Sequence, residues 1–263
     1  MFLAARQLLL GTSLGRAAMT ARDYFRLIST PRIALGTMVN DQISSRLAVE
    51  LCPADGIFVD IGAHIGSVIS EVRHKRPHAT IIAFEAIPDK AEALKRKFPS
   101  VTVHCCALAQ NDGSQSFYVD LRESGCSSLA RTQEAVKEIS VETRRLDGVI
   151  GTMHVDVIKI DVEGAELGVL LGASKTIEQS RPVVMFESGP GVRLGYTKEA
   201  MFEYFRAQNY MLFAPNRLAH TGTGMSLDAF LDSHEYPRRT TNYFAIPQER
   251  ELEIRERARS IKI

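Results

Sequence analysis

Short apolar runs alternate with amphipathic stretches through most of the chain. The first run, Ile57–Ile61, is typical of a buried strand, and Ser67–Lys75 after the next turn has helical spacing. Pro88 stands where a helix over Asp89–Phe98 would begin, a position that proline favours. The alternation predicts further strands over Thr80–Phe84, Val101–Cys105, Val155–Ile160, Arg181–Glu187, Tyr210–Phe213 and Asn242–Ile246, and helices over Gly164–Leu171 and Lys198–Gln208.

This order of elements predicts an α/β fold. Strands that alternate with helices at this length form an open, mostly parallel sheet with helices on both faces. One run differs, because the turn Asn111–Gly113 leads into Gln115–Asp120, whose alternation predicts a strand outside the main parallel order. Before the first strand, Met38–Leu51 has apolar residues at helical spacing and predicts a helix with one buried stripe.

The two ends of the chain differ from this pattern. The first 22 residues are apolar, carry Arg6, Arg16 and Arg22, and contain no acidic residue. Such a segment suits an amphipathic helix, a contact with a membrane surface or partner, or an organellar transit segment, whereas Arg6 interrupts the apolar run of a secretory signal. Pro31 breaks the stretch that follows. We therefore divide the chain into an N-terminal helical extension (1–37), one domain (38–248) and a charged, solvated helical tail (249–263).

Composition narrows the classes of function. The 263 residues include 32 Lys and Arg against 31 Asp and Glu, a net charge of +1, so a dedicated nucleic-acid-binding protein is not expected. A hydrophobic content of 45% suits a globular domain with a sizeable core. The four cysteines lack zinc-like spacing and predict buried free thiols in a reducing, cytoplasmic location: Cys52, Cys105, Cys106 and Cys126. The oligomeric state stays open.

Acidic residues follow directly on several of the predicted strands. In a doubly wound sheet, ligands bind outside the carboxyl ends of the strands, so these positions are informative. A purely structural pattern would place acids in the helices and leave the strand ends to Gly, Asn and Ser. The acids at strand ends are Asp60, Glu85, Asp161, Glu163 and Glu187.

The turn after the first strand indicates the kind of ligand. Gly62 and Gly66 permit a tight turn and close approach of backbone amides, although a simple strand-to-helix turn is the alternative. A nicotinamide site would favour glycine where the chain has His64 and Ser67. Asp60 would repel a pyrophosphate and suits an amine or a cationic centre, while Glu85 suits a ribose diol. These two requirements describe S-adenosylmethionine.

Four segments resemble the FkbM-type methyltransferases. They are FVDIGAHIGS, AFEAIPDKAEALKRKF, VHCCALAQNDGSQSFYV and, most specifically, VIKIDVEGAELGVLLGA. The resemblance extends from about Met38 to Pro247 and implies a class I, Rossmann-like fold, with a doubly wound, mostly parallel sheet of the seven-stranded type. Two departures affect the acceptor pocket: many relatives have Asn in place of His64, and often an aromatic residue just after Gly66.

The resemblance also implies the residues that bind the cofactor. Glu85, with Ala86 beside it, would bind the ribose hydroxyls, and Cys106, Ala107 and Leu108 would lie against the adenine. Ser127 and Ser128, in the loop Gly125–Leu129, would bind near the amino-acid end of the cofactor or form an exposed turn. The turn that holds the cofactor would comprise Asp60, Gly62, Ala63, His64 and Gly66, with Asp161 also in contact.

Methyl transfer to a hydroxyl needs help at the nucleophile, because a hydroxyl is un-ionised near neutral pH. Asp161, Glu163 and Glu187 are the leading candidates for a general base, and the same three would hold Mg²⁺ if a divalent cation were used instead. A metal-free base is the favoured interpretation. Asp161 as a helix cap or cofactor contact is an alternative, and His64 suits the pocket wall better than the role of base. The poorly patterned 215–239 region, with His220 and His234, predicts a lid or acceptor wall.

The sequence therefore predicts an S-adenosylmethionine-dependent methyltransferase that acts on oxygen. The resemblance points to a sugar hydroxyl of a glycan, glycolipid or glycosylated metabolite. Two alternatives stay open: an N-methyltransferase acting on an amino sugar or peptide, and a cofactor-binding subunit without catalysis.

Overall fold

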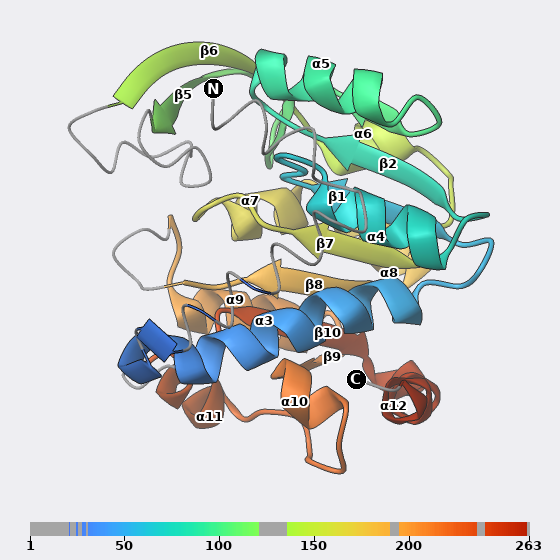
Figure 1. The fold of residues 1–263 in the computed structure, drawn as a ribbon, viewed down its shortest axis with the longest axis vertical. Helices are drawn as coiled ribbons and strands as arrows, with labels where there is room; N and C mark the ends of the chain where they lie inside the picture. Colours follow the sequence, from blue (N-terminus) through green and yellow to red (C-terminus); the bar gives the residue numbers. More distant parts are fainter. Residues whose placement is uncertain are drawn as a thin grey trace.

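The computed structural model describes residues 21, 25, 28–29, 31–120, 136–189, 195–235 and 240–261. A seven-stranded sheet crosses the molecule from top to bottom in Figure 1, in the order β3-β2-β1-β7-β8-β10-β9. Its strands are β1 (Ile57–Ile61), β2 (Thr80–Phe84), β3 (Thr102–His104), β7 (Val157–Ile160), β8 (Val183–Glu187), β9 (Tyr210–Phe213) and β10 (Asn242–Pro247).

The sheet is parallel except at one strand. β1 lies at the topological switch point, because the chain runs outward from it to β2 and β3 and then returns to β7 on its other side. Only β10 is antiparallel, to both β8 and β9. The carboxyl ends of β1, β2, β7 and β8 therefore meet at one edge of the sheet. The acids that follow these strands lie at that same edge. The predicted fold class is confirmed.

Helices cover both faces. On the front of Figure 1 the apolar sides of five helices meet the sheet through residues such as Leu47, Ile69 and Leu94. These helices are α3 (Pro31–Leu51), α4 (Ser67–Lys75), α5 (Pro88–Lys97), α10 (Pro215–Leu218) and α12 (Glu251–Ser260), the last preceded by a 3₁₀ turn, Gln248–Arg250. The predicted bounds of the α4 helix are confirmed.

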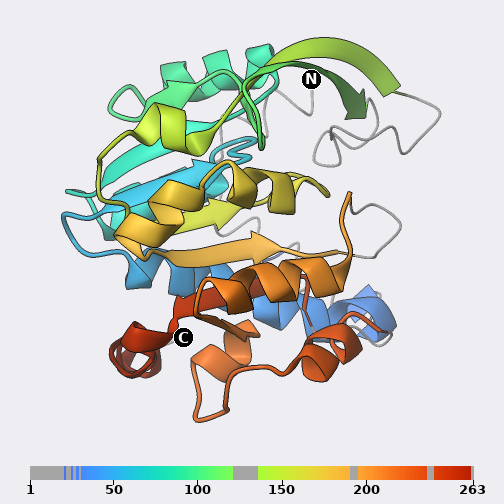
Figure 2. The same cartoon turned by 180° about the vertical axis from the view of Figure 1, so that it is seen from behind.

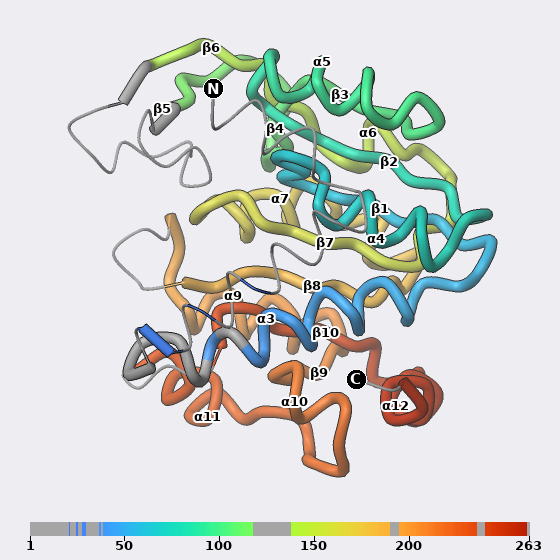
Figure 3. Tube along the Cα trace, in the orientation of Figure 1, coloured from blue at the N-terminus to red at the C-terminus, as the bar shows by residue number. Residues whose placement is uncertain are grey.

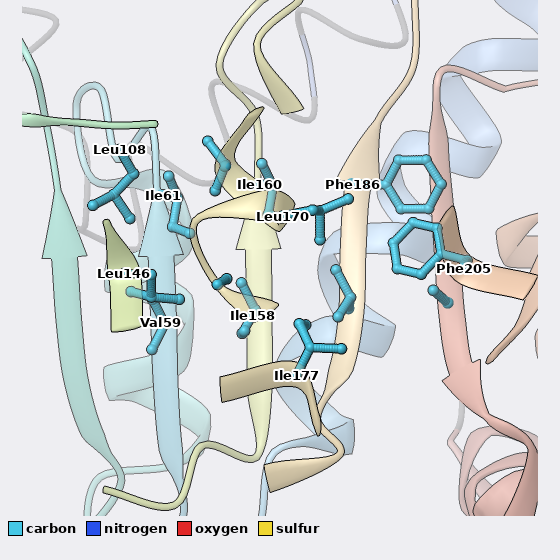
Figure 4. Close-up of a cluster of buried hydrophobic side chains, with 14 of the residues drawn as sticks. Val59, Ile61, Leu108, Leu146, Ile158, Ile160, Leu170, Ile177, Phe186 and Phe205 are labelled. Carbon is cyan, nitrogen blue, oxygen red and sulfur yellow. The ribbon is translucent and has the colours of Figure 1, made fainter. Parts of the chain in front are cut away.

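The opposite face has a second core. Figure 2 shows its helices in front, and Figure 4 shows Leu146, Leu170 and Ile177 of three of them packed on the strand residues Val59 and Ile158. The helices are α6 (Leu146–Ile150), α7 (Glu166–Leu171), α8 (Ser174–Ser180), α9 (Lys198–Ala207) and α11 (Leu227–Asp232).

A small second sheet lies beside the first, near α5. It has the order β4-β6-β5, with β4 (Ala107–Leu108), β5 (Gly113–Asp120) and β6 (Val136–Arg144), and β5 and β6 form the long hairpin at the top of Figure 3. The prediction that Gln115–Asp120 stands outside the main parallel order is confirmed.

Three predictions need correction. Helix α3 begins at Pro31 rather than Met38. Proline is tolerated at the start of a helix, because the N–H group that it lacks would have no hydrogen-bond partner within the helix there. The tail helix α12 is not solvated all round: Ile254 and Ala258 are fully buried on the front core, and Arg257 donates to the Leu51 carbonyl at 2.9 Å. Cys105 is exposed, whereas Cys52 and Cys106 are buried thiols as predicted.

Most of the predicted extension 1–37, and Cys126, lie outside the described residues. Among the helices that the structure describes, none combines the length and apolar character needed to cross a bilayer.

Candidate active site

The turn after β1 has a backbone that only particular residues allow. Gly62 has φ +76°, and a Cβ there would lie 1.9 Å from the Asp161 carbonyl oxygen. Gly66 has φ +81°, and a Cβ there would meet the Phe98 ring at 2.4 Å. Both glycines are thus required by close packing as well as by conformation. Between them, His64 also has positive φ (+50°), an unusual conformation for a side chain of its size.

Glu85, directly after β2, fixes this turn. Its two carboxylate oxygens accept backbone N–H groups from His64 at 2.8 Å and Ile87 at 2.9 Å. The side chain is only 5% exposed. Burial raises its pKa, while the Ile87 N–H, the Lys90 charge and the His64 N–H oppose that rise. Each carboxylate oxygen keeps a second lone pair, so Glu85 can still accept hydroxyl groups from a ligand.

A cleft opens between this turn and the small sheet. Its lining combines apolar residues from β4 and β5 with acids that follow β2 and β7. Burial raises the pKa of Cys106 to about 11, so this thiol is a packing surface and not a nucleophile. The cleft lining brings together most of the predicted site: Gly62, His64, Glu85, Ala86, Cys106, Ala107, Leu108, Asp161 and Glu163, together with Phe117 and Lys90.

The predicted cofactor contact Asp60 lies elsewhere. It is 1% exposed, is not part of the cleft lining that the structure describes, and faces Lys159 of β7 at 3.3 Å. Within the described chain, neither oxygen of Asp60 has a hydrogen bond with good geometry, so this ion pair is its main compensation. Burial raises the pKa of Asp60, and the charge of Lys159 opposes the rise.

Lys159 is a site residue that the sequence did not predict. Its ammonium lies 3.2 Å from Asp161 Oδ2 and donates to the Gly62 carbonyl at 2.9 Å. Burial lowers its pKa, but the charges of Asp161 and Asp60 outweigh burial and raise the pKa overall, so the group stays charged. A lysine within an apolar strand gives no signal in the sequence, because its partner is on a strand about a hundred residues earlier.

Three carboxyl groups gather where β7 and β8 end. Asp161, Glu163 and Glu187 each present an oxygen within 4.8 Å of the others. Burial raises the pKa of Asp161, but the Lys159 charge and a hydrogen bond with Glu187 lower it below its usual value. Burial, with the neighbouring Asp161 charge, raises the pKa of Glu187 well above its ordinary value. Asp161 therefore ionises at lower pH than Glu187, and a protonated Glu187 donates a hydrogen bond to Asp161.

The Glu166 carboxylate stabilises the backbone turn at Glu163 and Gly164 by accepting a hydrogen bond from it. Glu163 has φ +55° and Gly164 +103°. One oxygen of Glu166, a residue 1% exposed, accepts the Gly164 N–H at 3.0 Å, and the other accepts the Tyr196 hydroxyl at 2.9 Å. Glu166 therefore fixes the turn that presents Glu163.

The other residues that the sequence predicted for the site lie in several places. Ala63 is 5% exposed and lies in the turn, and Gly66 begins α4. Ser127 and Ser128 lie outside the described residues. His234 is buried, and its two ring nitrogens form hydrogen bonds with the Phe230 carbonyl and the Ser188 hydroxyl. A second hollow adjoins the cleft through three shared residues, Leu108, Glu163 and Ala165.

Comparison with known proteins gives related matches. A family model described as "Methyltransferase FkbM domain" matches residues 60–212, more than half of the chain. "Methyltransferase 1" of Beauveria bassiana is 28% identical in an alignment of 147 residues that covers 46% of this chain and 59% of that protein. "2-O-methyltransferase NoeI" of Sinorhizobium fredii is 28% identical in an alignment of 148 residues that covers 48% of this chain and 61% of that protein.

The chain thus spans about three fifths of the length of these two curated relatives. Among solved structures, "Methyltransferase FkbM" from Methylobacillus flagellatus matches with a TM-score of 0.48 and 17% identity, over 73% of this chain and 44% of that one.

Proposed function

This chain belongs to the FkbM methyltransferase family, and we propose that it transfers a methyl group from S-adenosylmethionine to a hydroxyl oxygen of a sugar-bearing acceptor. The observation that carries the proposal is one cleft whose lining combines apolar residues, the buried Glu85 carboxylate and the acids Asp161 and Glu163. These three kinds of lining suit an adenine, a ribose diol and a sulfonium-bearing amino acid.

The residues fit this cofactor. Ala107, Leu108 and Phe117 would pack on the adenine, and Glu85 would accept the ribose hydroxyls through its remaining lone pairs. The glycine at position 62 lets the turn pack directly on the Asp161 backbone, because a Cβ there would lie 1.9 Å from the Asp161 carbonyl oxygen. At the acidic end, one ammonium faces two carboxylates, Asp60 and Asp161. A carboxylate at Asp161 attracts a cationic ligand.

The chemistry assigns a role to Asp161. When bound, S-adenosylmethionine supplies a methyl group on a cationic sulfur that departs as a neutral thioether, so no acid is needed. The acceptor hydroxyl must lose its proton, and Asp161, which lines the cleft and ionises before Glu187, would receive it. Glu187, whose pKa is raised, would keep Asp161 oriented by donating to it while protonated. General-base assistance of this kind contributes about 10²- to 10⁴-fold.

The carboxylate cluster also allows a second candidate for activating the acceptor. Oxygen ligands from Asp161, Glu163 and Glu187 are the type that Mg²⁺ prefers, and their mutual distances permit a shared ion. The metal-free base is favoured because Lys159 already places a positive charge 3.2 Å from Asp161. Chelator followed by Mg²⁺ separates the two, since a metal-free enzyme responds to neither.

The oxygen acceptor is supported by one relative, whose name states 2-O-methylation. An N-methyltransferase is the main alternative, because an amine can lose its proton without Asp161. A subunit that binds the cofactor without catalysis is the other alternative.

Calorimetry and product release test the proposal together. S-adenosylmethionine should bind with measurable heat, and NAD at the same concentration should not. Release of S-adenosylhomocysteine is then measured across glycosides, amino sugars and simple alcohols. Turnover of glycosides and not of amines supports the proposal, whereas preferential binding of NAD, or turnover of amines only, overturns it.

A further inference from the structure

Lys159 occupies a place where a charged side chain is costly. It lies on the central strand β7 and is 5% exposed, and its register partner on β1 is Asp60. Its register partner on β8 is Met185, and the next residue out from Asp60 is Ala83 of β2. Moving an ammonium into such surroundings costs several kcal/mol, and an apolar side chain here would avoid that cost. A role beyond stability is therefore indicated.

The ammonium joins backbone and carboxylate groups of two strand ends. It donates to the Gly62 carbonyl at 2.9 Å, has the Ile61 carbonyl at 3.5 Å, and forms ion pairs with Asp161 Oδ2 at 3.2 Å and Asp60 Oδ1 at 3.3 Å. Two of these acceptors belong to the candidate site: Gly62 is in the cofactor turn, and Asp161 is the candidate base. They come from different strands, and Lys159 joins them through one atom.

We propose that Lys159 is a positioning residue, which holds the Gly62 turn and the Asp161 carboxylate in one fixed arrangement, and that Asp60 is its buried counter-ion. Asp60 then acts through Lys159 and does not contact the cofactor, in agreement with its place outside the described cleft lining. The inference rests on the proposed function for the role of Asp161. Its structural part stands independently of that function.

Two substitutions separate positioning from simple ion pairing. Lys159→Met alone leaves Asp60 buried without its partner, and a large loss of stability is expected. The variant Asp60→Asn with Lys159→Met removes both charges and should unfold near the wild-type denaturant midpoint. Lys175→Met, on the exposed surface of α8, serves as the matched lysine control. Failure of Asp60→Asn to restore the stability of Lys159→Met overturns the inference.

Activity and hydrogen exchange give the decisive readings on the double variant. Its turnover should stay about 10²-fold below wild type, the effect of a misplacement near 1 Å, although its stability has recovered. Amide exchange in peptides that contain Gly62–Gly66 and Asp161–Gly164 should be at least about tenfold faster, while β8 keeps wild-type protection. Lys175→Met should match wild type in all three measurements.

A simple ion pair predicts a different result. Recovery of turnover and of amide protection together with stability would overturn the positioning role. The exchange measurement needs no cofactor, so it decides the inference even if the wild-type protein neither binds S-adenosylmethionine nor releases its product. Absence of binding in the wild-type protein would instead refute the proposed function.

Discussion

The two ends of the cleft are built in different ways. The acidic end stands on β7 and β8 of the main sheet, where Asp161 is held by Lys159 and Glu187. The apolar end stands on β4 and β5 of the small sheet, where Ala107 and Phe117 contact each other in a minor cluster. Bond-making chemistry requires precise placement, whereas packing on a flat ring tolerates small shifts. The end where the reaction would occur is the one whose carboxylate is held by an ion pair and a hydrogen bond.

The largest difference between the two ends should come from Asp161→Asn. This change keeps the shape of the side chain and removes the charge that would accept a proton, so turnover should fall by about 10²- to 10⁴-fold. Affinity for S-adenosylmethionine, measured by calorimetry, should change only a few-fold. Glu203→Gln, on α9 away from the cleft, is the matched control. Full activity of Asp161→Asn would show that the acidic end is not the catalytic end.

Glu85→Gln tests the boundary between the two ends. The amide keeps one acceptor oxygen but loses the charge and one of the two backbone contacts to His64 and Ile87. Loss of one hydrogen bond to a charged group costs about 1.5–3 kcal/mol, so cofactor affinity should fall by about 10- to 100-fold. Calorimetry measures it directly. Unchanged affinity would remove Glu85 from the ribose assignment.

Phe117→Leu should have a smaller effect, confined to binding. The change keeps an apolar surface at the edge of the cleft and removes the aromatic face. Stacking on a base is worth about 1–3 kcal/mol, and leucine retains part of it, so affinity should fall by less than about tenfold. Turnover at saturating cofactor should match wild type. A turnover defect as large as that of Asp161→Asn would contradict the proposed division of the cleft.

Glu187→Gln should have the smallest effect at low pH and a growing one at high pH. The pKa of Glu187 is raised in the folded state, so its contribution to stability is complete below the ordinary glutamate pKa and is lost as pH rises toward the raised value. Glutamine imitates the protonated form and avoids this loss. The variant's Tm should therefore exceed that of wild type by a few degrees near neutral pH, and the gap should close near pH 4. A constant gap would contradict the assignment of the proton to Glu187.

The sequence predicted the main sheet because its strands are continuous apolar runs between glycine turns. It missed β6 (Val136–Arg144), since VKEISVETR is rich in charge and has one face in solvent. The acids at strand ends were predicted as a set, and the parallel order brings Asp161, Glu163 and Glu187 together.

Lys159 could not be predicted in the same way. The role of Lys159 depends on the register between β1 and β7, which places it opposite Asp60. Periodicity within one strand carries no information on which residue of a distant strand lies opposite. The same holds for Glu166, whose acceptor role depends on the left-handed turn at Glu163.

The central position of β1 also has a consequence for how the polypeptide acquires its structure. β1 and β2 leave the ribosome early, yet β7, the other neighbour of β1, emerges only about a hundred residues later. Until then the apolar β1 has one unpaired edge, and contacts of such long sequence separation form slowly. A nascent chain that pauses before β7 would therefore expose an apolar strand with an unpaired edge, which chaperones bind. Synonymous codon changes that alter the rate of translation between β3 and β7 should change the soluble yield and leave the folded protein the same.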